Sequence, residues 1–237
     1  MKSITKEWTE LSVSDGTRMR AYTAYPAGMS GLPGLIIIQE AFGVNSHIRD
    51  VVERFAREGY AAIAPELYHR TVSGFEGSYT DFAAIAPHRE VLTDTRLEAD
   101  LHSAYMWLLS QEFVDGKAIA SVGYCMGGRA SFLANTSLPL KAAVSYYGGN
   151  IAPALLPRAK DMHGPILMFW GGKDSHIPPE QYRGVSDALR AAGKPYVEVV
   201  FSEGDHGFFC DERGSFNKTV AKQSWALTLE FLKEQLS

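Results

Sequence analysis

A cysteine stands between glycines at the spacing Gly123-x-Cys125-x-Gly127, and another glycine follows at position 128. An apolar run at 118–122 comes just before this motif, and a helix-like stretch at 129–135 follows it. A cysteine at a sharp strand-to-helix turn is a candidate nucleophile, because a thiolate can attack a carbonyl carbon. Flanking glycines would let strand and helix approach the turn closely. A buried, unreactive cysteine in a Gly-rich turn is the alternative interpretation.

Strand-like and helix-like segments alternate along the chain, which predicts an α/β fold with one mostly parallel sheet and helices on both faces. No repeat or linker interrupts the pattern, so a single domain over residues 1–237 is expected. Periodicity and apolar runs predict strands at 35–39, 60–64, 118–122, 141–147, 166–170 and 196–201. The expected helices cover 46–58, 93–110, 129–135, 179–192 and 216–236. An antiparallel pair of strands is expected within 9–25, around the turn at 14–16.

The segment 66–87 has no clear periodicity and predicts a long loop with room for one short helix. Loops of this length in compact domains are often lids or binding loops. The sequence does not decide whether this one moves.

Composition excludes several classes of protein. The chain has 237 residues, a net charge of -4 and scattered Lys and Arg, which does not support nucleic-acid binding. No apolar stretch is long enough for a membrane span, and the first residues lack the apolar core of a signal peptide. With two cysteines in all, a reduced, cytoplasmic location is expected, and a disulfide between Cys125 and Cys210 is not.

Two further residues complete a possible catalytic set. In an open parallel sheet, catalytic groups gather beyond the carboxyl ends of the strands. Asp174 follows the expected strand 166–170, and His206 follows 196–201. An imidazole can accept the thiol proton, and a carboxylate can orient the imidazole and support its positive charge. Cys125, Asp174 and His206 are therefore the predicted nucleophile, acid and base.

Two neighbours compete for these roles. Asp205 is adjacent to His206, and His176 lies in the loop that carries Asp174. Both fit the strand ends less well. An aspartate in a Gly-rich loop can also be only a turn former, and a loop histidine can be only solvated.

A carboxylate, Glu40, comes directly after the strand 35–39. A charge there is costly to bury without a partner, and a side chain that reaches solvent is the alternative. The next residue lies in a loop that can supply a backbone donor. The N–H groups of Ala41 and Met126 are the predicted pair that holds an oxyanion.

Five motifs together resemble the dienelactone hydrolase family of α/β-hydrolases. They run in the family's order through most of the chain: 39–45 (QEAFGVN), 64–68 (APELY), 123–128 (GYCMGG), 172–174 (GKD) and 204–208 (GDHGF). The resemblance implies an α/β-hydrolase fold with a triad of Cys125, His206 and Asp174. It also implies that Glu40 contacts the resting thiol and helps to deprotonate it when substrate binds. Such a thiol would be less exposed to oxidation between turnovers.

The sequence departs from the family at a substrate-binding position. The family holds its substrate's carboxylate with arginines, one of them four residues after the catalytic histidine, where this chain has Cys210. Arg89 and Arg213 could substitute, although solvated surface positions are the simpler interpretation. Aromatic residues in the candidate pocket loops would suit an apolar or aromatic acyl group, although aromatics more often belong to the core. The predicted substrate contacts are Phe42, Tyr79, Arg89, Tyr124 and Phe208.

These observations predict a cofactor-free hydrolase of a lactone or carboxylic ester, without a metal, that acts through a thioester acyl-enzyme. Its partner would be a small-molecule ester or lactone. A general carboxylesterase or thioesterase without lactone preference is the alternative among enzymes. A non-catalytic ligand-binding protein on the same fold is the alternative outside them. Both a monomer and a homodimer stay open.

Overall fold

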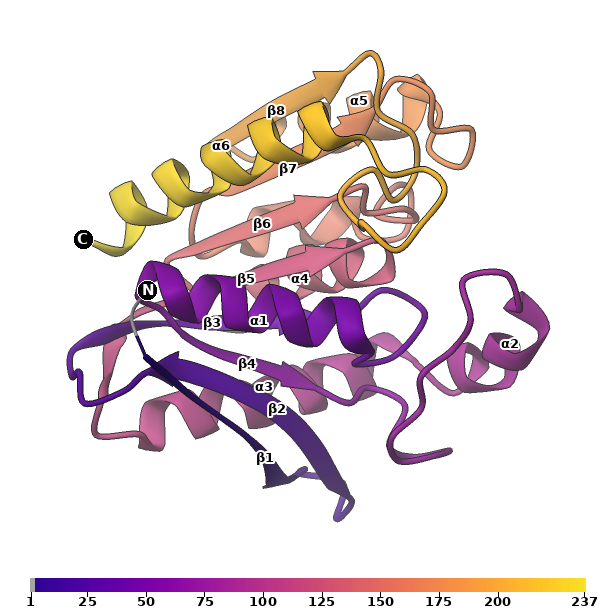
Figure 1. Cartoon of the computed structure of the whole chain (residues 1–237). Helices are drawn as coiled ribbons and strands as arrows, with labels where there is room; N and C mark the ends of the chain where they lie inside the picture. The colour runs from indigo at the N-terminus through magenta and orange to yellow at the C-terminus, as the bar shows by residue number, and fades with distance from the viewer. Residues whose placement is uncertain (1–2) are drawn as a thin grey trace. The chain divides into compact units, whose positions relative to one another are not determined.

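The computed structural model of the chain describes residues 3–237, which form two compact units divided after Ala120. The first unit contains β1 (Ile4–Ser12), β2 (Arg18–Pro26), β3 (Leu32–Ile38), α1 (Ser46–Glu58), β4 (Ala61–Pro65), α2 (Phe82–Glu90), α3 (Asp94–Ser110) and the start of β5 (Val114–Tyr124) (Figure 1). The second contains the end of β5, α4 (Met126–Ser137), β6 (Ala142–Tyr146), the 3₁₀ helix η1 (Leu156–Asp161), β7 (Ile166–Gly171), α5 (Pro179–Ala191), β8 (Tyr196–Phe201) and α6 (Lys218–Leu236).

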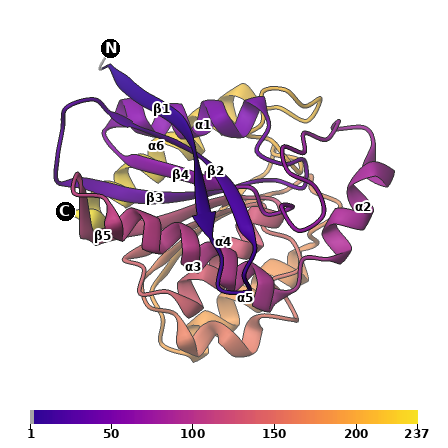
Figure 2. The same ribbon diagram turned by 90° about the horizontal axis from the view of Figure 1, so that it is seen from below.

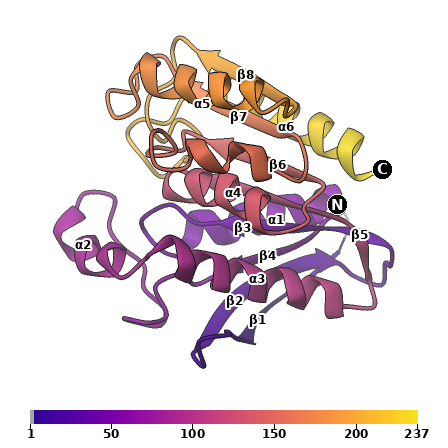
Figure 3. The ribbon, with the colours of Figure 1, turned by 180° about the vertical axis from the view of Figure 1, so that it is seen from behind.

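The strands of the first unit follow the order β1-β2-β4-β3-β5. β1 pairs antiparallel with β2 along its whole length, and Figure 2 shows the two strands side by side. β2 is antiparallel to β4, whereas β4 is parallel to β3, with Leu35 opposite Ala62. α1 contacts β2 and β4, and α3 contacts β3 and β4. The two helices cover opposite faces of these strands (Figures 1 and 3).

Local sequence explains the β3–α1 unit. Leu35 to Ile38 are completely buried, as expected for an apolar strand covered on both faces. The Asn45 side chain caps α1 by accepting the Ile48 N–H at 3.2 Å. Gly59 ends the helix with φ 111°, a left-handed conformation that favours glycine. The predicted helix 46–58 is therefore confirmed.

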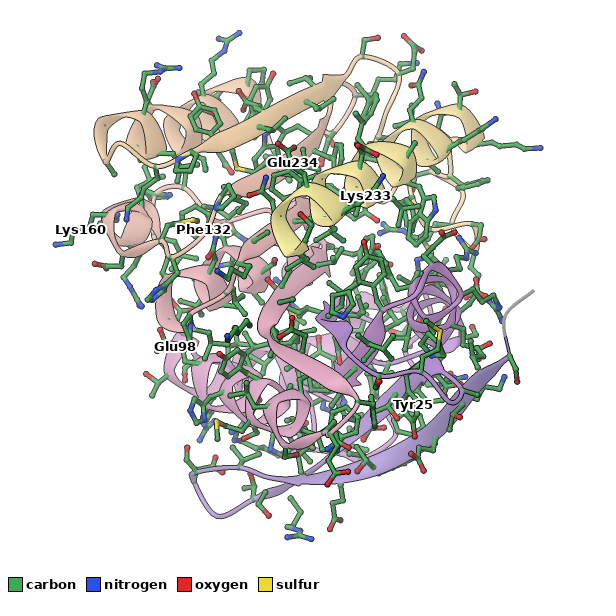
Figure 4. The ribbon with its side chains drawn as sticks, turned by 90° about the vertical axis from the view of Figure 1, so that its left-hand side faces the viewer. Tyr25, Glu98, Phe132, Lys160, Lys233 and Glu234 are labelled. Atoms are coloured by element: carbon green, nitrogen blue, oxygen red, sulfur yellow. The ribbon has the colours of Figure 1, made fainter. Side chains whose placement is uncertain are left out.

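The second unit orders its strands β5-β6-β7-β8, and β6, β7 and β8 are parallel. α6 covers one face of these strands, and α4 and α5 cover the other (Figures 1 and 3). Figure 4 labels Phe132 of α4, which is fully buried, and Lys233 and Glu234 of α6, which are exposed. A buried hydrogen bond of 2.6 Å between the Tyr146 hydroxyl and Thr228 Oγ1 ties α6 to β6.

The predicted α/β class with mostly parallel strands is confirmed, and the largest differences from the expected elements are in β1, β5 and η1. β1 begins at Ile4 rather than near residue 9, because Ile4 to Trp8 continue the pairing with β2. β5 extends beyond the expected 118–122 at both ends, and η1 was not expected. The expected short helix within 66–87 is α2, capped by Asp81. That residues 1–237 form one domain stays a prediction.

None of the helices within residues 3–237 has both the length and the apolar character that crossing a bilayer requires.

Candidate active site

Cys125 occupies a strained turn between β5 and α4. Its φ of 53° and ψ of -115° lie in a region that residues other than glycine rarely adopt. The turn is held on both sides: the Cys125 N–H donates to the Tyr146 carbonyl at 3.0 Å, and the Cys125 carbonyl accepts from Gly128 N–H at 2.9 Å. Strain that persists under such restraint is characteristic of functional sites.

The glycines of this motif are required by close backbone approach. A Cβ on Gly123 would lie 1.8 Å from the Gly127 carbonyl oxygen. A Cβ on Gly128 would lie 2.6 Å from the Tyr146 carbonyl oxygen at the end of β6. Neither neighbour is a flexible side chain, so these positions cannot carry a larger residue without moving the strand or the helix.

Three side chains of the second unit form a continuous relay. His206 follows β8, and its Nδ1 lies 2.7 Å from Asp174 Oδ2, in the loop after β7. Its Nε2 lies 3.0 Å from Cys125 Sγ. Asp174 is buried, and the His206 side chain is 12% exposed. Because an ionised carboxylate can only accept, Nδ1 carries a proton that it donates to Asp174. The structure thus brings together the three residues predicted as a triad.

The electrostatics of the relay favour a charged imidazole. Burial opposes the charge on His206, but hydrogen bonds to Asp174 and Cys125 outweigh this and raise the pKa of His206 to about 10. Burial also disfavours the ionised form of Asp174 and by itself would raise its pKa. The hydrogen bond from His206 more than offsets it and lowers the pKa of Asp174 below its usual value. The hydrogen bonds of the relay therefore favour the imidazolium form of His206 at neutral pH.

This charged imidazole should make stability depend on pH in a defined direction. Because the pKa of His206 is raised from 6.5 to about 10, its contribution to the free energy of unfolding is complete below about pH 6.5. That contribution is lost as the pH rises through about 10. We expect urea titrations to show a larger loss of stability between about pH 7 and 10 in the wild type than in His206→Gln. Equal losses in the two proteins would contradict this prediction.

The start of α4 supplies a second influence on the thiol. Cys125 occupies the N-cap position, and Met126 is the first residue of the helix. The positive end of a helix dipole stabilises negative charge that develops at the first turn. A helix N-terminus and an imidazolium therefore meet at the same sulfur atom.

Asp205 and His176, the alternatives for the acid and the base, make other contacts. Asp205 Oδ1 accepts the backbone N–H of His206 at 2.6 Å, so the carboxylate on the imidazole ring is that of Asp174. The His176 N–H donates to Asp174 Oδ1 at 2.8 Å, and its exposed ring lies edge-on to His206, 5.3 Å between centroids. His176 thus orients the carboxylate through its backbone.

The other predicted residues divide between the two units. Tyr124 and Phe208 are completely buried in the second unit. Tyr124 stacks on Tyr146, with 4.7 Å between ring centroids, and Phe208 packs edge-on against Phe201. Core packing accounts for both. Met126, the predicted oxyanion donor of this unit, lies beside Cys125.

Five predicted residues belong to the first unit. Glu40 and Ala41 follow β3 and are buried, at 1% and 6% exposure. The Phe42 ring packs on Tyr79, with 4.6 Å between centroids. Arg89 is exposed in the last turn of α2. The roles predicted for these five residues stay predictions.

Sequence reasoning missed Tyr147 and did not place Arg213, which it offered as a possible substrate-binding residue. Tyr147 follows β6 with φ 38°, and its buried ring lies 5.2 Å from His206. The Arg213 guanidinium lies against Gly207, where a Cβ would be 2.4 Å from Arg213 Nη1. Gly207 adopts a φ of 82°, which also favours glycine. The Gly-Gly pair that follows Tyr147 was the only signal of an unusual turn there.

Known proteins of one family resemble this chain. The model of the dienelactone hydrolase family matches residues 19–236. A Salmonella typhimurium protein provisionally named carboxymethylenebutenolidase is 38% identical over 93% of this chain and 84% of its own length. A similarly named protein of Synechocystis is 32% identical over 92% of this chain and 93% of its own.

Solved structures show the same fold. A crystal structure from Klebsiella pneumoniae, provisionally named a dienelactone hydrolase, has a TM-score of 0.90 and 35% identity, with 98% of this chain and 99% of that chain covered. A dienelactone hydrolase-like promiscuous phosphotriesterase, P91, has a TM-score of 0.84 at 23% identity, with 99% and 100% covered, and shows the fold alone.

The fold is thus that of the α/β-hydrolases, as predicted. The chain belongs to the dienelactone hydrolase family. Its activity is that of a carboxylic ester or lactone hydrolase of this type.

Proposed function

We propose that the protein hydrolyses a small-molecule lactone or carboxylic ester through a cysteine thioester. The relay Cys125–His206–Asp174 carries the proposal: Sγ lies 3.0 Å from Nε2, and Nδ1 lies 2.7 Å from the carboxylate. Thiol, imidazole and carboxylate at hydrogen-bond distance are the arrangement that nucleophilic acyl transfer requires.

In this mechanism Cys125 attacks the carbonyl carbon as a thiolate, with its proton held by His206, and the carbonyl electrons move to oxygen to form an oxyanion. The backbone N–H groups of Met126 and Ala41 hold that oxyanion. The imidazolium of His206 gives a proton to the leaving alcohol or enol as the tetrahedral centre collapses to a thioester. His206 then takes a proton from water, which attacks the thioester and releases the acid and the Cys125 thiolate, so that the starting pair is restored.

Glu40 has a separate proposed role, which comes from the family resemblance. It would contact the thiol and take part in its deprotonation when substrate binds. Its burial at the end of β3, where it is 1% exposed, supports this role, because a buried carboxylate must be held by contacts within the protein.

Substrate recognition is the less defined half of the proposal. Phe42 and Tyr79 form an aromatic pair in the first unit, which suits an apolar acyl group. For a substrate carboxylate, the position of Arg213 against the residue after His206 supports it as a candidate beside Arg89. We further propose a cytoplasmic location, because a catalytic thiol is kept reduced there.

Trapping of the acyl-enzyme by mass spectrometry tests this function. We expect enol lactones and aryl esters to add the mass of their acyl group to the peptide that contains Cys125. A higher kcat/KM for enol lactones than for aryl esters would favour a lactonase, and the reverse a general esterase. An adduct on a serine, or ligand binding without any product, would overturn the proposal.

A further inference from the structure

The loop after β3 is held by side-chain hydrogen bonds to two consecutive carbonyl groups. Gln39 Nε2 donates to the Glu40 carbonyl oxygen at 3.2 Å. The Tyr68 hydroxyl donates to the Ala41 carbonyl oxygen at 2.9 Å. All of these atoms are buried. The backbone around Ala41, one of the two proposed oxyanion donors, therefore has specific supports in its own unit.

The orientation of the Gln39 amide follows from its two partners. Its Oε1 accepts the Leu67 N–H at 3.2 Å, and the residue is 1% exposed. A backbone N–H can only donate, so the amide oxygen must face Leu67. The amide nitrogen must then face the Glu40 carbonyl, which can only accept. Gln39 bridges the loop after β4 to the loop after β3, and both ends of its amide are used.

The bond to the Glu40 carbonyl controls the N–H that follows it. The peptide between Glu40 and Ala41 is planar and trans, so its C=O and N–H point in opposite directions. Holding the Glu40 oxygen sets the direction of the Ala41 N–H. We propose that Gln39 is a positioning residue for the reaction, because it aims the Ala41 N–H as an oxyanion donor. The inference rests on the proposed function, in which this N–H holds the oxyanion.

The surrounding contacts restrict the loop further. The Gly77 N–H donates to the Phe42 carbonyl at 2.9 Å. A Cβ on Gly43 would lie 1.9 Å from the Phe75 carbonyl oxygen, so the two backbones are in direct contact. A donor that stabilises developing charge is effective when it is already oriented before the reaction. A loop packed this closely can transmit the position of one side-chain amide to one N–H.

Substitution of Gln39 by methionine tests the proposal, because methionine keeps the length of the side chain and makes neither bond. We expect kcat for an aryl ester to fall by about 10- to 100-fold with KM nearly unchanged, as for a donor that acts mainly in the transition state. Alkylation of Cys125 by iodoacetamide forms no oxyanion, so its rate should change by less than about 2-fold. Gln39→Glu, which keeps an acceptor for Leu67, should give the same pattern.

Two controls separate positioning from general damage. Asn135 makes an equivalent buried bridge in the second unit, with Nδ2 on the Gly164 carbonyl at 2.8 Å and Oδ1 accepting the Gly164 N–H at 3.0 Å. Asn135→Leu should lower stability without changing the ratio of ester turnover to alkylation. Tyr68→Phe removes a bond to the next peptide, whose N–H belongs to Phe42, and should lower kcat less than Gln39→Met.

The outcomes are distinct. An unchanged ratio of turnover to alkylation in Gln39→Met, or an equal drop in Asn135→Leu, would overturn the positioning role. If Gln39→Met does not fold, the ratio measured for Gln39→Glu decides. Failure of the wild type to form an acyl-enzyme on Cys125 would instead overturn the proposed function itself.

Discussion

Replacing Cys125 by alanine is expected to lower kcat/KM for esters and lactones by at least about 10⁴-fold, because the only proposed nucleophile is lost. The imidazole of His206 and the carboxylate of Asp174 would remain, but no atom at 3.0 Å from Nε2 could attack the carbonyl. Initial rates with an aryl ester and an enol lactone, on protein checked by thermal unfolding, measure the effect.

The chain offers a matched control in its second cysteine. Cys210 is completely buried, and its N–H donates to the Gly207 carbonyl through the backbone, which alanine preserves. Cys210→Ala should keep most of the activity. Substantial turnover by Cys125→Ala, with rates lost in Cys210→Ala instead, would mean that the nucleophile is elsewhere.

Replacing Asp174 by asparagine is expected to lower kcat by about 10³-fold, because the imidazole loses the carboxylate that fixes its tautomer and supports its charge. The pKa of His206, now about 10, should fall in this variant, since the Asp174 bond is a main cause of the elevation. The imidazolium would then be lost at lower pH. We expect the alkaline limb of the pH–rate profile to move to lower pH together with the drop in kcat.

Asp205 provides the control for this carboxylate. It lies next to His206 in the chain, and among the side-chain hydrogen bonds described its carboxylate accepts only the backbone N–H of that residue, at 2.6 Å. Asp205→Asn keeps an oxygen acceptor for this bond, so kcat and the alkaline limb should change little. A larger effect in Asp205→Asn than in Asp174→Asn would reverse the assignment of the acid.

Much of the fold could be predicted because its signals are local. The apolar run at 35–39, the Asn45 cap and the Gly59 stop define β3 and α1 without reference to the rest of the chain. The N-terminal extension of β1 was harder to predict from the sequence. Its residues Ile4 to Trp8 lack a clear alternation, and pairing with β2 makes them a strand.

Much of the candidate site could be predicted for a related reason. A parallel sheet sends each strand end to the same edge, so Asp174 and His206 could be selected by their positions after β7 and β8. Chain order alone left Asp205 and His176 as competitors. Only the folded loops show which carboxylate oxygen reaches the imidazole ring and which reaches a backbone N–H.

Contacts between distant segments could not be predicted from the sequence. Gln39 bonds to the backbone 28 positions later, and no property of a lone glutamine indicates such a bridge. The same holds for Tyr147 against His206 and for Arg213 against Gly207. By type, the aromatic residues Tyr124 and Phe208 were equally suited to a pocket or to the core; the structure buries both completely, and a contact of either with substrate stays a prediction.

By itself, the sequence determined the class of the fold, the order of the reactive residues and the need for glycines around Cys125. These properties depend on local backbone preferences and on the common direction of parallel strands. The tertiary structure decided the pairing of Asp174 with His206, the charge of the imidazole and the bridge made by Gln39. Those depend on the approach of atoms far apart in the chain, where a shift of about 1 Å makes or breaks a hydrogen bond.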